Sequence, residues 1–177
     1  MATIAPSLCD AERLVGLIDS DDPYVAGHAA TIEAQLAAAD ELFQDRVGKI
    51  KLLANRAEEG GVSKVRSLHD LVPLLFAHTA YKSYPESWLM DGKWDRLGKW
   101  LDTVSTNRVD PMDTNAIHGL DEWLAVLETK GHFVSCSSGT TGKCAMMNAN
   151  QADLDFCVKA LLQMIRWGGL APNHDRR

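Results

Sequence analysis

The chain has 177 residues, of which 46% are hydrophobic, and this is enough for one or two domains with a buried core. Its 24 acidic and 18 basic residues give a formal net charge of −6, which argues against a protein that binds nucleic acid through its overall charge. The N-terminus has no cationic start followed by a long apolar stretch, and no apolar run approaches the roughly 20 residues that span a bilayer. We therefore expect a cytoplasmic protein with no nucleic-acid or membrane partner.

The cysteines and histidines are dispersed along the chain. No two cysteines form a CxxC pair, and no histidine stands at the spacing of a zinc site. We therefore expect neither a structural zinc site nor a disulfide framework, and we assign no metal ligand in this chain. The cysteines are Cys9, Cys136, Cys144 and Cys157.

Residues 1–66 are predicted to form an N-terminal helical region with one long helix. Asp22–Pro23 suits an N-cap followed by the first helical residue. Apolar residues then recur at heptad-like spacing, interrupted only at Arg46, and Gly60–Gly61 suits the C-terminal end. The helix is therefore expected near residues 23–59, and its apolar stripe suits either packing within its own domain or a coiled-coil dimer.

A second region, residues 67–177, begins with further helical patterns. Ser67 and Asp70 stand at capping distance, and residues 107–118 have no periodicity and are expected to be a loop. Two stripes with helical spacing flank this loop, and their tryptophans suit a hydrophobic core. The stripes are Trp94, Leu97, Trp100, Leu101 and Val104, and then Leu120, Trp123, Leu124 and Leu127.

The chain changes character after Gly131. Short strands are expected over residues 132–136 and 144–148, and a helix with a polar N-cap at Asn150 follows. Gly168–Gly169 suits the end of this helix. Its expected buried stripe is Leu154, Val158, Leu161, Leu162 and Ile165.

Segment 137–143, between the two strands, is the part of the chain that packing does not explain. Its glycines allow backbone N–H groups to converge, its hydroxyls add donors, and its lysine adds a positive charge, as in loops that bind polyphosphates. A plain hairpin turn is the alternative. The Walker A pattern is not met, because serine replaces its first glycine and Cys144 replaces its magnesium ligand. The segment is Ser137, Ser138, Gly139, Thr140, Thr141, Gly142 and Lys143.

This segment resembles the ATP phosphate loop of the adenylate-forming (AMP-binding) superfamily. It is most similar to the phenylacetate–CoA ligase and LuxE-type acyl-protein synthetase groups, which also carry an Asp-hydrophobic-Asp step like Asp153–Asp155. Upstream, residues 70–76 followed by Lys82–Pro85 are similar to a Leu-Pro-Phe…Lys…Tyr-Pro stretch of the same ligases. The family usually has proline where this chain has Cys144.

The resemblance implies a helix-rich α/β fold in which residues 67–177 begin the large domain of an acyl-adenylate-forming ligase. It implies ATP, Mg²⁺ and a carboxylic acid as ligands, with coenzyme A as a candidate thiol acceptor. Lys143 would be catalytic and would also bind the nucleotide with Ser137, Ser138, Gly139, Thr140, Thr141 and Gly142. The adenine-binding and lid elements of the family have no counterpart in this sequence.

The chain is accordingly expected to be the N-terminal portion of a longer ligase that acts with the missing C-terminal part or as a homodimer. The alternative is a non-enzymatic helical interaction module with a vestigial nucleotide loop. Cys136 and Cys144 are interpreted as small apolar strand residues rather than acyl carriers. Lys82 and Tyr84 are assigned no catalytic role, and His132 is interpreted as a surface or capping residue rather than part of an acyl pocket.

Overall fold

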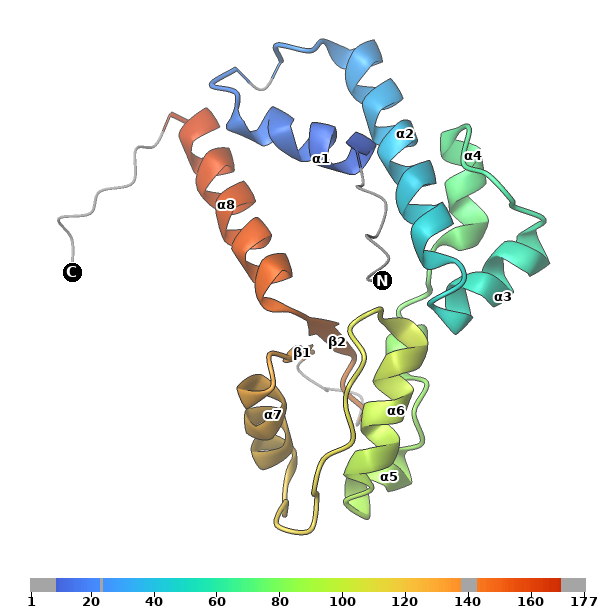
Figure 1. Ribbon diagram of the computed structural model, residues 1–177, viewed down its shortest axis with the longest axis vertical. Helices are drawn as coiled ribbons and strands as arrows, with labels where there is room; N and C mark the ends of the chain where they lie inside the picture. The colour runs from blue at the N-terminus through green and yellow to red at the C-terminus, as the bar shows by residue number, and fades with distance from the viewer. Residues whose placement is uncertain (1–8, 23, 138–142, 170–177) are drawn as a thin grey trace, which may run out of the picture.

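The computed structural model describes residues 9–22, 24–137 and 143–169. Within these ranges the chain is mostly helical, and its two strands pair in one antiparallel sheet (Figure 1). The sequence therefore indicated the coarse fold class correctly. In chain order the elements are α1 (Cys9–Gly16), η1 (Leu17–Asp19), α2 (His28–Arg46), α3 (Lys51–Gly60), α4 (Leu68–Leu71), η2 (Val72–Leu74), η3 (Ala80–Lys82), α5 (Glu86–Met90), α6 (Trp94–Val104), α7 (Leu120–Thr129), β1 (Phe133–Cys136), β2 (Met146–Ala149) and α8 (Gln151–Trp167).

The single long helix expected near residues 23–59 is wrong. Helix α2 begins only at His28, and Asp22 instead accepts a hydrogen bond from the Tyr24 backbone N–H at 2.8 Å in a turn. A turn that contains Gly48 then separates α2 from α3. Glycine inside a helix is about 1 kcal/mol less favourable than alanine, so this position favours an interruption of the helix. The break follows the interruption of the apolar stripe at Arg46 and lets α3 pack against α2.

A small hydrophobic cluster holds this helical pair to the segment that follows. Phe43 of α2, Ala57 of α3 and Val65 are buried together with Leu74 of η2. The cluster therefore spans the predicted boundary between residues 1–66 and 67–177.

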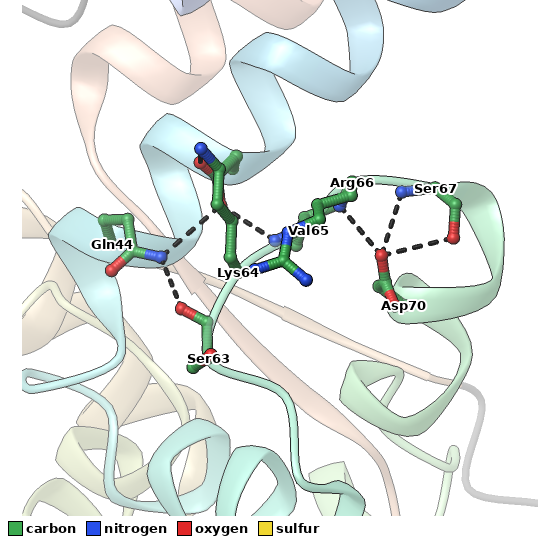
Figure 2. A network of polar contacts seen from close by, with 8 residues as sticks. Gln44, Ser63, Lys64, Val65, Arg66, Ser67 and Asp70 are labelled. Atoms are coloured by element: carbon green, nitrogen blue, oxygen red, sulfur yellow. Dashed lines mark hydrogen bonds and ion pairs between the residues drawn. The ribbon is translucent and has the colours of Figure 1, made fainter.

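Polar contacts to the backbone support the same junction (Figure 2). The Asp40 carboxylate accepts a hydrogen bond from the Val65 N–H at 2.8 Å, and the Gln44 amide donates to the Ser63 carbonyl at 2.8 Å. Ser67 and Asp70 form the predicted capping box at the start of α4. The backbone N–H of Arg66 donates to the Asp70 carboxylate and, with the bonds from Ser67, holds the pKa of Asp70 below its usual value.

The larger core lies beneath the predicted tryptophan stripes. Helices α6 and α7 match the expected elements, and residues 107–118 lie between them outside any helix or strand. Trp94 stacks on Trp123 with ring centroids 5.8 Å apart, and the Trp94 indole N–H donates to the Ile117 carbonyl at 3.0 Å. The buried members of this core are Tyr84, Trp94, Leu97, Trp100, Leu101, Ile117, Trp123, Leu127 and Met146.

The two predicted strands and the helix after them are present, with the second strand beginning at Met146, but the predicted buried stripe of that helix is wrong. Asn150 caps α8 by accepting a hydrogen bond from the Asp153 N–H at 2.9 Å, and Gly168 follows the last helical residue. The side chains of Val158, Leu161 and Leu162 are 58%, 55% and 45% exposed.

Helix α8 rises from the sheet toward the end of the molecule that holds α1 and α2 (Figure 1). Its attachments there are mostly polar: Gln163 and Trp167 both donate to the Ser20 carbonyl at 2.8 Å, and Lys159 pairs with Asp19 at 2.7 Å. Gln163 is the one buried residue of α8, so little of its apolar face meets another element. None of the helices in the described ranges combines the length and apolar character needed to cross a bilayer.

Candidate functional site

The candidate site lies at the turn end of the β1–β2 hairpin, where Ser137 at the start of segment 137–143 pairs with Ala145 just beyond its end. The strands pair from Phe133 opposite Ala149 to Cys136 opposite Met146. Beyond the strands, the Ser137 N–H donates to the Ala145 carbonyl at 3.0 Å, and the Ala145 N–H donates to the Ser137 hydroxyl oxygen at 2.8 Å. Of the predicted site residues, the structure describes Ser137 and Lys143; Ser138, Gly139, Thr140, Thr141 and Gly142 lie outside the described residues.

Lys143 is half-buried and points back onto the core rather than out into solvent. Its ammonium donates a hydrogen bond to the backbone carbonyl of Tyr84 and lies 4.8 Å from the centroid of the Tyr84 ring. A cation over an aromatic face is attracted by the negative potential of that face. The structure therefore brings the predicted catalytic lysine to a residue 59 positions earlier in the chain.

Tyr84 also holds the residue that follows the lysine. Its hydroxyl donates to the Cys144 carbonyl at 2.7 Å and lies 3.5 Å from the Cys144 sulfur. The ring is fully buried and packs edge-on against Trp100, with centroids 4.9 Å apart. Burial, together with the hydrogen bond to the Cys144 thiol, raises the pKa of Tyr84 well above its usual value, so the hydroxyl remains a donor at physiological pH.

Tyr84 is the site residue that the sequence analysis missed. Nothing in its local sequence marks it beyond the Tyr-Pro step of the upstream resemblance. Its position depends on the packing of η3 against β2, which joins segments distant in the chain. Ser83 is placed by the same packing, since its hydroxyl accepts a hydrogen bond from the Trp100 indole at 2.9 Å.

The two cysteines beside segment 137–143 differ in environment. Cys136 is exposed and Cys144 is half-buried. Loss of hydration near the hairpin, followed by the neighbouring Cys144 thiol, raises the pKa of Cys136 to about 11. A thiol with this pKa is protonated at neutral pH and is a weak nucleophile.

A separate polar cluster lies at the far end of the hairpin, around the start of α8. The Asn148 amide nitrogen donates to the Asn107 carbonyl at 2.8 Å and lies 3.3 Å from Nδ1 of His132. Asn150 donates to the Asn107 side chain at 3.0 Å. His132 also lines an open groove of about 360 Å³ with Leu124, Glu128, Phe133, Val134, Ser135, Ala149 and Leu154. These hydrogen bonds connect Asn107, in the loop between α6 and α7, to β2 and to the residue that caps α8.

The donor set at the hairpin suits an anion rather than a metal ion. A lysine ammonium and a serine hydroxyl bind phosphate oxygens, whereas Mg²⁺ takes carboxylate, carbonyl and phosphate oxygens. No group of three or more histidine, cysteine, aspartate or glutamate side chains is placed to hold a metal within the described ranges.

Three comparisons with known proteins gave no family to which the chain can be assigned. No family model matches the sequence, no curated protein matches it, and no solved structure matches the fold.

Proposed function

We propose that this chain supplies the ATP phosphate-binding loop of an acyl-adenylate-forming ligase. The observation that carries the proposal is the pairing of Ser137, the first residue of a Ser/Thr/Gly/Lys segment, with Ala145, two positions after Lys143 at its end. Backbone N–H groups of a glycine-rich segment can converge on an anion, and hydroxyls and a lysine in the same segment add donors. The resemblance of residues 137–143 to the phosphate loop of the superfamily points to the same ligand.

The reaction that fits this loop is activation of a carboxylic acid. A carboxylate oxygen forms a bond to the α-phosphorus of ATP, the bond from that phosphorus to the bridging oxygen breaks, and pyrophosphate leaves. A thiol such as that of coenzyme A then attacks the acyl carbon, and AMP leaves. Mg²⁺ bound to the phosphates would neutralise part of their charge. Loop donors assist by stabilising the charge that develops on the leaving pyrophosphate.

Lys143 must change partners to take part in this reaction. Its ammonium is held by a neutral carbonyl and an aromatic ring at Tyr84. An anionic phosphate adds charge–charge attraction that the neutral carbonyl lacks, so bound ATP favours the exchange. In this state Lys143 binds the β- and γ-phosphates, while Ser137, Ser138, Thr140 and Thr141 donate to phosphate oxygens and Gly139 and Gly142 leave space for them.

Titration of Mg·ATP into the purified chain tests the proposal. The Lys143→Ala variant is expected to bind ATP on the order of tenfold or more weakly, because a hydrogen bond to a charged group contributes about 1.5–3 kcal/mol. Lys130→Ala is the matched control. Lys130 is a lysine at the C-terminal end of α7, shortly before β1 begins and outside segment 137–143. It is expected to bind like the parent chain.

Two outcomes decide against the role of the lysine. One is equal ATP affinity of the parent and Lys143→Ala chains when thermal unfolding shows both to be folded. The other is an equal loss of affinity in Lys130→Ala. Release of pyrophosphate on adding ATP and a panel of carboxylic acids would extend the test from binding to the reaction.

A second candidate function is a non-enzymatic helical interaction module, and the exposed apolar face of α8 favours it. Phe156, Val158, Leu161, Leu162 and Met164 are 42–58% exposed on this one helix. Exposed apolar side chains in this number on one helix are a feature of protein interaction sites. The same titration separates the two candidates, because the module predicts association between proteins without ATP binding.

A further inference from the structure

Cys136 and Cys144 lie on the same face of the β1–β2 hairpin. Cys136 is paired with Met146, and successive residues of a strand point to opposite faces. Cys144 precedes Met146 by two residues and therefore shares its face and that of Cys136. The cysteines are diagonal neighbours across the end of the ladder, one on each side of segment 137–143.

The two thiols are near each other as well as on one face. The Cys144 thiol is close enough to Cys136 to help raise the pKa of Cys136. The hydroxyl of Tyr84 lies 3.5 Å from the Cys144 sulfur and holds the adjacent carbonyl at 2.7 Å. Cys136 is also exposed, so a small reagent can reach the pair from solvent.

Joining the two sulfurs requires a small movement of the backbone near Cys144. Diagonal neighbours across a ladder are separated by about 7–8 Å between Cα atoms, and a disulfide spans about 4.4–6.8 Å. Cys144 precedes the first residue of β2 and is not part of the ladder. The approach can therefore come from residues 143–145, which shifts the Cys144 carbonyl relative to the Tyr84 hydroxyl while the pairing of β1 with β2 is kept.

We propose that Cys136 and Cys144 are a dithiol modification site, which a low-molecular-weight disulfide such as oxidised glutathione converts to an intramolecular disulfide. One thiolate attacks a sulfur of the reagent, forms a mixed disulfide and releases one glutathione thiolate. The second protein thiolate then attacks the protein-bound sulfur, the protein–glutathione bond breaks, and a second glutathione thiolate leaves. The dithiol loses two protons and two electrons, and the reagent gains them as two thiols.

The bond closes the base of the hairpin over the segment that carries the proposed phosphate loop. The site rests on the pairing of β1 with β2, which places the two cysteines near each other, so it does not depend on ATP binding. Because the reaction is scored by the mass of the protein, failure of the nucleotide proposal leaves this test intact.

The test uses the full chain with Cys9→Ser and Cys157→Ser, which leaves only the pair. This protein is incubated with oxidised glutathione at mildly alkaline pH, where more thiol is ionised. Remaining thiols are then alkylated in denaturant and the intact mass is measured. We expect the mass to fall by two hydrogens, with neither cysteine alkylated, and digestion to yield one cross-linked peptide that dithiothreitol separates.

Two single variants complete the experiment. Adding Cys136→Ser or Cys144→Ser to the same background is expected to stop the reaction at a mixed disulfide with one glutathione. In the oxidised parent the midpoint of thermal unfolding should rise, because a disulfide restricts the unfolded chain. Separate glutathione adducts on both cysteines without a cross-link would overturn the proposal, as would two cysteines that stay fully alkylatable.

Discussion

Tyr84 contacts the chain on both sides of the Lys143–Cys144 peptide bond. Its carbonyl and ring hold the ammonium of Lys143, and its hydroxyl holds the carbonyl of Cys144. The ring is buried against Trp100, so these contacts originate from a fixed point in the core. A buried residue thus positions the start of the segment that leads into β2.

Removing the Tyr84 hydroxyl tests its contact with Cys144 separately from the contacts with Lys143. Tyr84→Phe keeps the ring and the backbone carbonyl but leaves the Cys144 carbonyl without its donor, so we expect a loss of about 1–2 kcal/mol in the free energy of unfolding. Tyr81→Phe is the matched control, since Tyr81 contacts Phe76 through its ring at 6.0 Å. Urea denaturation measures both. Equal stability of Tyr84→Phe and the parent chain would contradict the proposed anchor.

At the scale of elements, the arrangement of α3 depends on a close approach at its end. A Cβ placed on Gly60 would lie 2.6 Å from Cβ of Pro73 in η2, closer than two carbon atoms can stand. Glycine at position 60 therefore allows η2 to pack against the end of α3, while Gly61, with a φ of 63°, ends the helix. In the sequence Gly60 indicates only a helix end, since the position of Pro73 depends on the tertiary structure.

This close approach predicts opposite effects at two glycines of the helical pair. Gly60→Ala should lower the free energy of unfolding by about 1–3 kcal/mol, because the added methyl group must displace Pro73. Gly48→Ala should be neutral or stabilising by up to about 1 kcal/mol, since nothing lies within 4 Å of its added Cβ. Chemical denaturation of both variants tests the difference. Equal effects would mean that α3 and η2 do not pack this closely.

At the scale of the whole molecule, α8 is attached by its polar residues and exposes its apolar ones. Gln163 donates to the Ser20 carbonyl, and Lys159 and Arg166 pair with Asp19 and Asp21. Phe156 lines an apolar groove of about 790 Å³ between α1 and α2. The helix spans the molecule from the hairpin to α1 while leaving much of its apolar stripe in solvent (Figure 1).

On most amphipathic helices, substitutions of apolar residues lower the free energy of unfolding more than substitutions of polar ones. The polar attachment of α8 predicts the opposite order. Leu161→Glu should change the free energy of unfolding by no more than about 0.5 kcal/mol, because the side chain is exposed. Gln163→Ala should cost about 1–2 kcal/mol, since it removes a hydrogen bond from the one buried residue of α8. Urea denaturation at low protein concentration, with sedimentation as a check on association, measures both. A larger loss in Leu161→Glu would contradict an exposed apolar face.

The sequence by itself determined the features that depend on neighbouring residues. The spacing of tryptophans and leucines predicted α6 and α7, the capping pairs at Ser67 and Asn150 predicted the starts of α4 and α8, and the change in composition after Gly131 predicted the hairpin. Periodicity and capping act over a few residues, so they can be read from the chain directly.

The tertiary structure decided which surfaces meet. It broke the expected helix into α2 and α3, placed Lys143 on Tyr84, set Cys136 near Cys144 through the strand pairing, and left Val158 and Leu161 of the predicted buried stripe in solvent. An apolar stripe requires a partner but does not specify one, and a lysine requires an acceptor but does not specify its place in the chain. Those choices depend on contacts between residues far apart in sequence, which local patterns do not encode.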